Sequence, residues 1–155
     1  MKALITTAVS VALLIVNPAV AQNIQHSPSG DRKTAIAPKE NFTGHAAVTT
    51  LFSPSKFSNA GGANVEFAPR ARSAWHTHPA GQTLVITSGI GWVQEDGATK
   101  REVRPGDVVF IPPNVRHWHG ATDSTSMTHV AITPTDGTSF ATWLEHVSDA
   151  QYVAN

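Results

Sequence analysis

The chain has 155 residues, with eleven basic side chains, eleven acidic side chains, eight histidines and no cysteine. This length suits one domain with a real core and excludes two domains of ordinary size. A near-neutral surface gives no reason to expect nucleic acid or an anionic membrane as a partner. The lack of cysteine excludes a disulfide framework and a thiolate metal site, so any bound metal must be held by nitrogen and oxygen atoms.

The first residues have the order of a secretory signal peptide. Lys2 precedes the apolar run 3–16, and Ala19-Val20-Ala21 offers a cleavage site of small residues. A membrane span is the alternative, but the run is shorter than the about 20 apolar residues that a bilayer requires. We therefore expect residues 1–21 to be a signal peptide. The mature chain would be exported to the periplasm or secreted, with no membrane attachment after cleavage.

Residues 22–41 differ in composition and in hydrophobic pattern from the rest of the mature chain. They are polar, contain Pro28 and Pro38, and show no hydrophobic periodicity. Such a segment is typical of a flexible lead-in. We expect residues 42–155 to form the single folded domain.

From Phe42 onward, short runs rich in Val, Thr, Ile, Phe and Trp are separated by turn signals such as Gly61-Gly62. Ser148 and Gln151 have the spacing of a capping box, which predicts a short C-terminal helix. Many short strands without intervening helices predict an all-β fold, a sandwich or barrel of the jelly-roll type. The expected strands cover residues 46–52, 63–68, 82–87, 91–95, 101–103, 107–111, 127–132 and 140–147.

Two histidine pairs stand out on this frame. In "WHTHPAGQT", His76 and His78 share one face of an extended chain, and Gln82 follows after a Pro-Ala-Gly turn. In "RHWHG", His117 and His119 form a second pair with the same spacing. A single pair has a structural explanation at least as often as a chemical one. Two pairs, each at the edge of a strand in one small β-domain, favour a metal site.

These segments resemble the motifs of the cupin superfamily. "WHTHPAGQT" resembles the first cupin motif, with Gln82 in place of the usual Glu, and "GDVVFIPPNVRH" resembles the second. The resemblance implies a single small cupin (jelly-roll) β-barrel. It also implies a divalent metal held by His76, His78, Gln82 and His117.

A narrower resemblance adds the segments "MTHVAI" and "WLEHVSDAQY". Together the four segments are similar to the manganese-dependent cupin hydroxynitrile lyases of bacteria. The resemblance implies cleavage or formation of cyanohydrins such as mandelonitrile, with Mn²⁺ as cofactor; Fe²⁺, Zn²⁺, Ni²⁺ and Co²⁺ suit the same donors. It assigns the general base to His129, for which the alternative is a core histidine satisfied by one hydrogen bond.

Further residues are expected to face the same cavity. His119 shares a strand face with His117, and either takes part in catalysis or hydrogen-bonds to a backbone carbonyl. Ala63, Val65 and Phe67 share one face of their strand and would form an apolar pocket wall suited to a small aromatic substrate. Ordinary core packing is the alternative for Phe67.

The amide at Gln82 leaves the double charge of a metal uncompensated, which favours Lewis-acid chemistry over oxygen chemistry. Two other functions stay open: a metal-dependent dioxygenase, and a non-catalytic periplasmic cupin that binds metal or a small ligand.

We also expect a homo-oligomer, a dimer or tetramer, because the apolar segment "AAVTTLF" (residues 46–52) would form an exposed strand edge able to pair with another chain.

Overall fold

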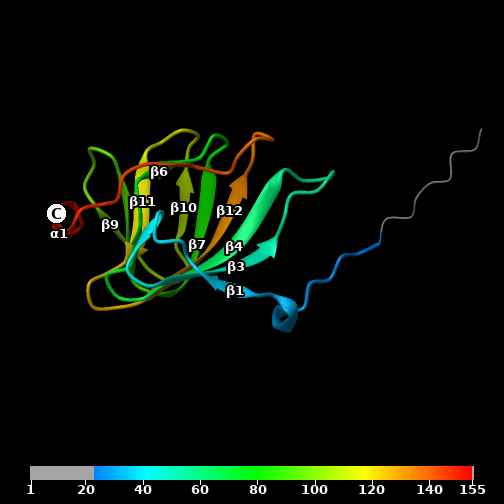
Figure 1. Cartoon of the computed structure of the whole chain (residues 1–155), viewed down its shortest axis with the longest axis horizontal. Helices are drawn as coiled ribbons and strands as arrows, with labels where there is room; N and C mark the ends of the chain where they lie inside the picture. Colours follow the sequence, from blue (N-terminus) through cyan, green and yellow to red (C-terminus); the bar gives the residue numbers. More distant parts are fainter. Residues whose placement is uncertain (1–22, 155) are drawn as a thin grey trace, which may run out of the picture.

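The structure is a computed structural model that describes residues 23–154, so the expected signal peptide lies outside the described residues. The chain folds into two β-sheets that face each other, with one short α-helix near the C-terminus (Figure 1). The predicted all-β fold with a C-terminal helix is confirmed. Among the described residues, no helix is both long enough and apolar enough to cross a membrane.

The first sheet has six strands in the order β1-β3-β4-β12-β7-β10, and all neighbours are antiparallel. Its central strand β12 alternates buried and half-buried residues, which is the period of a strand with one face in a core. The bounds are β1 Thr34–Ile36, β3 Ala46–Phe52, β4 Ala60–Phe67, β12 Met127–Pro134, β7 Gln82–Gly89 and β10 Val108–Ile111.

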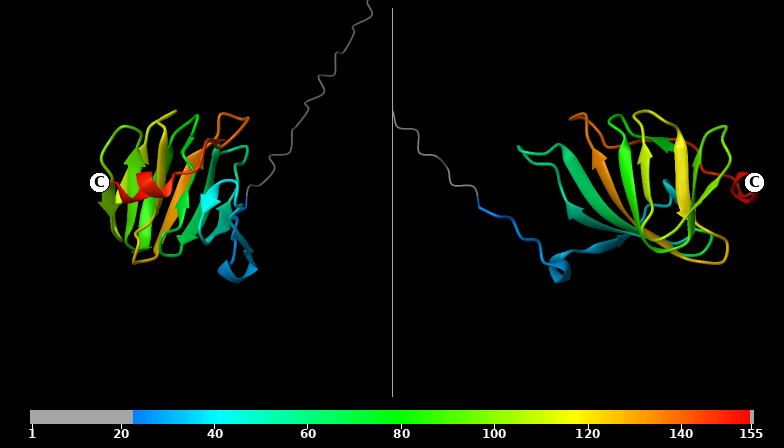
Figure 2. Two further views of the ribbon diagram at one scale, coloured as in Figure 1. Left: turned by 60° about the vertical axis from the view of Figure 1, so that its left-hand side comes forward. Right: turned by 180° about the vertical axis from the view of Figure 1, so that it is seen from behind.

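The second sheet has the order β13-β6-β11-β5-β2, and β11 also pairs with β8, which pairs with β9. The chain crosses repeatedly between the two sheets (Figure 2). Apolar side chains such as Phe67, Leu84 and Ile86 pack together in the core. The bounds are β2 Phe42–Thr43, β5 Arg72–Ser73, β6 His76–Thr77, β8 Gly91–Glu95, β9 Arg101–Val103, β11 His117–Ala121 and β13 Thr142–Trp143.

The expected flexible lead-in, residues 22–41, contains regular structure. A 3₁₀ turn covers Ser29–Asp31, and β1 pairs with β3 so that Ala35 lies opposite Val48. Strand β1 has only three residues, which are too few for an alternating pattern to be recognised in the sequence. It forms because it pairs with the edge of β3. The same pairing covers part of the edge on which the oligomer prediction rested. Oligomeric assembly therefore stays a prediction without that support.

The turn expected at Gly61-Gly62 is wrong, because both glycines lie inside β4. A side chain at Gly62 would overlap the ring of Phe52, and a Cβ at Gly61 would lie 3.1 Å from the ring of Phe140. A glycine within a strand often marks such a close approach. Here the missing side chains make room for two aromatic rings.

The chain after β12 crosses one end of the barrel before it reaches α1, Asp149–Val153 (Figures 1 and 2). The strand expected over residues 140–147 is reduced to β13, which pairs with β6. The predicted capping box is confirmed: the Gln151 N–H donates to Ser148 Oγ, and the Ser148 N–H donates to Gln151 Oε1.

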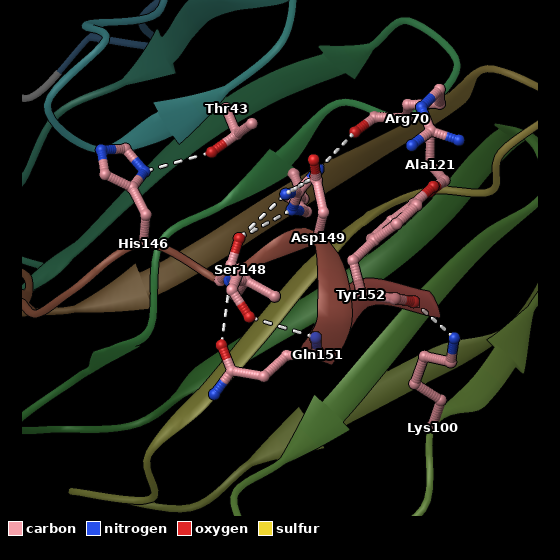
Figure 3. Close-up of polar contacts among 11 residues, drawn as sticks. Thr43, Arg70, Lys100, Ala121, His146, Ser148, Asp149, Gln151 and Tyr152 are labelled. Atoms are coloured by element: carbon pink, nitrogen blue, oxygen red, sulfur yellow. Dashed lines mark hydrogen bonds and ion pairs between the residues drawn. The ribbon is translucent and has the colours of Figure 1, made fainter. Parts of the chain in front are cut away.

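Buried polar contacts fix the end of this C-terminal segment to the second sheet (Figure 3). The Tyr152 hydroxyl donates to the Ala121 carbonyl at 2.9 Å, and Tyr152 is fully buried. The Arg72 guanidinium donates to the Val147 carbonyl at 2.9 Å and pairs with Asp149 at 2.8 Å. The segment is therefore held at β5 and β11, after it has crossed the barrel.

We expect Tyr152→Phe to lower the free energy of unfolding by about 1–3 kcal/mol, because the buried Ala121 carbonyl loses its donor in a place that water does not reach. Denaturant unfolding of the metal-free protein measures this. Thr34→Val is the control, since it removes a side-chain hydrogen bond that is exposed to solvent and should cost little. An unchanged unfolding free energy for Tyr152→Phe would show that the hydrogen bond from Tyr152 to Ala121 does not hold the segment.

Candidate functional site

Histidines from both sheets converge on one cavity. His117 in β11 lies directly opposite His76 in β6, so the two histidine pairs of the sequence become neighbours through sheet pairing. Gln82 opens β7, and His129 lies in the adjacent strand β12. The residues of this group that line the cavity are His76, His78, Gln82, His119 and His129, and His117 lies immediately beside His76, with ring centres 4.2 Å apart.

The imidazoles are close enough to share one bound ion. Ring nitrogens of His76, His117 and His119 lie within 4.8 Å of one another. The ring of His78 is centred 5.0 Å from that of His76 and 5.3 Å from that of His117. The trio His76, His117 and His119 thus shares two residues with the expected ligand set and adds His119, which was expected to have a catalytic or supporting role.

Backbone carbonyls fix the orientation of three imidazoles. The Nδ1 atoms of His76, His78 and His117 lie 2.9, 2.7 and 2.9 Å from carbonyl oxygens of Ala74, Phe140 and Val115 respectively. Because a carbonyl oxygen only accepts, each Nδ1 carries the proton and each Nε2 keeps its lone pair. This is the arrangement that usually supports histidine ligands of a metal.

Buried atoms without partners are concentrated at this place. Within residues 23–154, seven buried side-chain nitrogen or oxygen atoms have no hydrogen-bond partner, and five belong to the cluster. Buried polar atoms are normally paired, so this concentration indicates a partner other than a protein group. Nitrogen lone pairs and an amide oxygen are suitable donors for a divalent cation, and the expected ligands fit a metal on this ground. The five atoms are His78 Nε2, Gln82 Oε1, His117 Nε2, His119 Nε2 and His129 Nδ1.

Burial keeps these imidazoles neutral. It lowers the pKa of His117 to about 4 and that of His129 to about 3. For His76, burial first and then the neighbouring His117 and His78 hold the pKa well below its ordinary value. Among the described residues that line the cavity, none is acidic. The site therefore presents neutral lone pairs at neutral pH.

His119 and His129 form a hydrogen-bonded pair, with His119 Nδ1 and His129 Nε2 3.2 Å apart. One ring donates and the other accepts, and the second nitrogen of each ring is buried without a partner. The ring of Phe67 packs against both, at 5.8 Å from His119 and 5.7 Å from His129. Phe67 thus supports the pair from the core and does not line the cavity, where it had been expected. It lies at the far end of β4, opposite Met127.

The cavity has a volume of about 620 Å³. This volume falls within the roughly 300–1,000 Å³ that is typical of small-molecule sites. Ala63 and Val65 line it as expected. Aromatic walls that sequence reasoning missed come from the end of β3 and from the C-terminal segment, whose path no local pattern indicates. Those residues are Phe52, Phe140 and Trp143.

Thr133 is a second residue that sequence reasoning missed. It lines the cavity on the same face of β12 as His129, and its hydroxyl accepts a hydrogen bond of 3.0 Å from Gln82 Nε2. The alternation of β12 could have placed it there, since residues four apart in a strand share a face.

Comparisons with known proteins identify the family of the chain. Residues 63–133 match the family model described as the Cupin domain. A curated relative from Granulicella tundricola, "(R)-mandelonitrile lyase", is 45% identical over 123 residues, which cover 79% of this chain and 94% of the relative.

Solved structures show the same fold. A cupin-like protein from Thermotoga maritima has a TM-score of 0.73 and 36% identity, with 84% of this chain and 95% of that chain covered. The polyketide cyclase RemF from Streptomyces resistomycificus has a TM-score of 0.66 and 17% identity, with 84% of this chain and 91% of that chain covered. At this identity the similarity supports the fold alone. The chain therefore belongs to the cupin family.

Proposed function

We propose that this cupin is a metal-dependent lyase of the hydroxynitrile lyase type. It would cleave a cyanohydrin such as mandelonitrile to an aldehyde and hydrogen cyanide, or form the cyanohydrin in reverse. The observation that carries the proposal is the group of unpartnered nitrogen and oxygen atoms beside a cavity with apolar walls. The 45% identity to a protein named (R)-mandelonitrile lyase supports it.

His76, His78, Gln82 and His117 would hold the metal. Mn²⁺ is the ion we propose, and Fe²⁺, Zn²⁺, Ni²⁺ and Co²⁺ suit the same donors. When bound, a divalent ion supplies a positive charge that lowers the pKa of a substrate hydroxyl. All four donors are neutral, so the protein leaves that charge uncompensated.

His129 is the base in this proposal. In the tautomer in which His129 Nε2–H donates to His119 Nδ1, the His129 Nδ1 lone pair is free to accept the hydroxyl proton of the cyanohydrin. Burial holds the pKa of His129 at about 3, which keeps this nitrogen unprotonated before reaction. A positioned imidazole is a common general base.

His119 completes the proton transfer. In the same tautomer its Nε2 carries a hydrogen and can give it to the departing cyanide. The C–CN bond breaks with its electron pair on cyanide, while the O–H electron pair forms the carbonyl. The His129 Nε2 proton moves to His119 Nδ1, so one proton passes from the hydroxyl to cyanide and both rings end neutral.

The apolar walls would bind the organic part of the substrate. Val65 and Ala63 lie on one side, and the rings of Phe52 and Phe140 lie over the two glycines of β4. Aromatic and aliphatic walls of this kind suit an aryl group, which buries a large apolar area. The polar reacting end would then point toward the imidazoles.

We also propose that the mature protein acts outside the cytoplasm, in the periplasm or as a secreted protein, on the basis of the signal-like residues 1–21.

Assembly as a dimer or tetramer is a further proposal. It finds support in the last strand of the first sheet, β10, where Val108 and Phe110 are 64% and 67% exposed.

The ligand assignment is tested by metal analysis of purified variants. We expect His76→Ala, His78→Ala and His117→Ala each to lose most of the metal, because an open site depends on all its donors. His26→Ala should bind metal normally, since this exposed residue lies outside the sheets. Loss of metal in His119→Ala but not in His78→Ala would instead assign the ion to His76, His117 and His119.

The base assignment is tested with His129→Ala. The variant should keep its metal but cleave mandelonitrile about two or more orders of magnitude more slowly. The loss should fall on kcat rather than KM, because a base acts in the transition state. Cleavage at the wild-type rate with unchanged metal content would exclude His129 as the base. If the wild-type protein, loaded with metal, cleaves no cyanohydrin, the lyase proposal fails.

The aromatic wall is tested with Gly62→Ala. The new methyl group would displace the ring of Phe52, and we expect the fold to be kept because that ring is half exposed. We expect KM for mandelonitrile to rise while metal content stays unchanged. Gly30→Ala serves as a control, because nothing lies within 4 Å of the added methyl group and Gly30 has no positive φ. An unchanged KM for Gly62→Ala would remove Phe52 from the substrate wall.

A further inference from the structure

We propose that Phe140 is a positioning residue of the metal site: its ring rests on Gly61 and fixes the carbonyl oxygen that orients His78. The inference rests on the metal-binding part of the proposed function and not on the reaction. It links the segment that crosses the end of the barrel, residues 135–147, to a ligand from a different part of the sequence.

His78 is held differently from the other two oriented imidazoles. The Nδ1 atoms of His76 and His117 each contact a carbonyl oxygen two residues earlier in the chain. His78 Nδ1 instead lies 2.7 Å from the carbonyl oxygen of Phe140, 62 residues later in the chain. Local backbone structure therefore orients two of the rings, whereas the orientation of His78 depends on where the crossing segment lies.

The Phe140 carbonyl selects one tautomer of His78, because a carbonyl oxygen accepts a hydrogen bond and cannot donate one. The proton therefore sits on Nδ1, and Nε2 keeps its lone pair for a cation. His78 Nε2 is buried without a partner, which agrees with this tautomer.

The other tautomer of His78 would harm the site. Burial lowers the pKa of His78, and the Phe140 carbonyl and the Gln82 side chain both oppose this shift, so Gln82 lies close to the ring. With its proton on Nε2, His78 could donate to Gln82 Oε1, which is also buried without a partner. Each of the two expected ligands would then occupy the donor atom of the other.

The ring of Phe140 supplies a contact between the crossing segment and the first sheet. Thr135 is hydrogen-bonded to the loop before β4, and the next pairing with a sheet begins at Thr142 in β13. In between, hydrogen bonds join residues 135–139 to one another. A Cβ on Gly61 would lie 3.1 Å from the Phe140 ring, so this ring rests on the backbone of β4. Loss of the ring should leave the Phe140 carbonyl less firmly placed.

The first measurement is the tautomer of each imidazole in metal-free protein, by nitrogen NMR spectroscopy. In the wild type, His76, His78 and His117 should all carry the proton on Nδ1. In Phe140→Ala, His78 should become a mixture of tautomers, because the carbonyl no longer stays on Nδ1. His76 and His117 should be unchanged and serve as controls within the same molecule, since nearby carbonyls of their own segments hold them.

The second measurement is the dissociation constant for Mn²⁺, by titration calorimetry on metal-free protein. Phe140→Ala should bind Mn²⁺ about 10- to 100-fold more weakly, the usual cost of losing a contact that orients a ligand. Phe140→Leu keeps an apolar side chain against Gly61 and should recover most of the affinity. Because the Phe140 side chain is 42% exposed, we expect both variants to fold.

Phe52→Ala is the matched control in both measurements. Phe52 is another half-exposed ring of the same cavity, and it rests on Gly62. Within residues 23–154, none of the three oriented imidazoles hydrogen-bonds to the backbone of Phe52. The variant should therefore keep the proton of His78 on Nδ1 and bind Mn²⁺ like wild type.

Four results would overturn the inference. They are wild-type affinity in Phe140→Ala, an equal loss of affinity in Phe52→Ala, a Phe140→Leu variant as weak as Phe140→Ala, and weaker binding with an unchanged tautomer of His78. If Phe140→Ala does not fold by circular dichroism, Phe140→Val takes its place in both measurements.

Failure of this inference can be told apart from failure of the lyase proposal. A wild-type protein that binds Mn²⁺ and shows the Phe140 effect, but does not cleave mandelonitrile, ends the lyase proposal and leaves Phe140 in its role. A wild-type protein that binds no Mn²⁺ in the titration overturns the inference itself.

Discussion

A buried polar atom needs a partner, and this constraint shapes the whole site. Backbone carbonyls accept the Nδ1 hydrogens of His76, His78 and His117, and the Thr133 hydroxyl accepts one amide hydrogen of Gln82. What is left inside the cluster are the Nε2 lone pairs of His78 and His117 and the amide oxygen of Gln82, beside the His119–His129 pair. Each unpartnered buried polar atom costs about 1–3 kcal/mol, so the cluster weakens the fold until something binds there. The same atoms that lower stability are the ones that equip the site for a cation.

The C-terminal segment serves both the cavity and the cluster. Phe140 contributes its ring to the wall and its carbonyl oxygen to His78, and the ring of Trp143 is centred 4.7 Å from that of His76. The segment is held beyond these contacts by Tyr152, whose hydroxyl reaches β11. Wall, ligand orientation and helix docking thus depend on one path of the chain across the barrel. No single stretch of sequence displays this dependence, because its contacts lie far apart in the chain.

Predictions from local pattern succeeded where the local pattern was sufficient. The strands expected at residues 46–52 and 91–95 have those bounds in the structure, and the Ser148 capping box forms as predicted. Predictions failed where the structure at a residue depends on contacts with residues that are distant in the sequence. Gly61 and Gly62 have the composition of a turn, yet they lie in β4, where rings from β3 and from the C-terminal segment occupy the space that their side chains would fill.

The sequence by itself determined the chemistry available to this protein: nitrogen and oxygen donors without cysteine, two histidine pairs, and an alternation that gives β-strands. It also placed the donors on common strand faces, since side chains two apart point the same way. Only the tertiary structure showed that His119 hydrogen-bonds to His129 and that Gln82 hydrogen-bonds to Thr133. It also showed that Phe67 packs against the His119–His129 pair. These contacts depend on which strands pair and in what register. Register is a property of two segments together, so neither segment displays it alone.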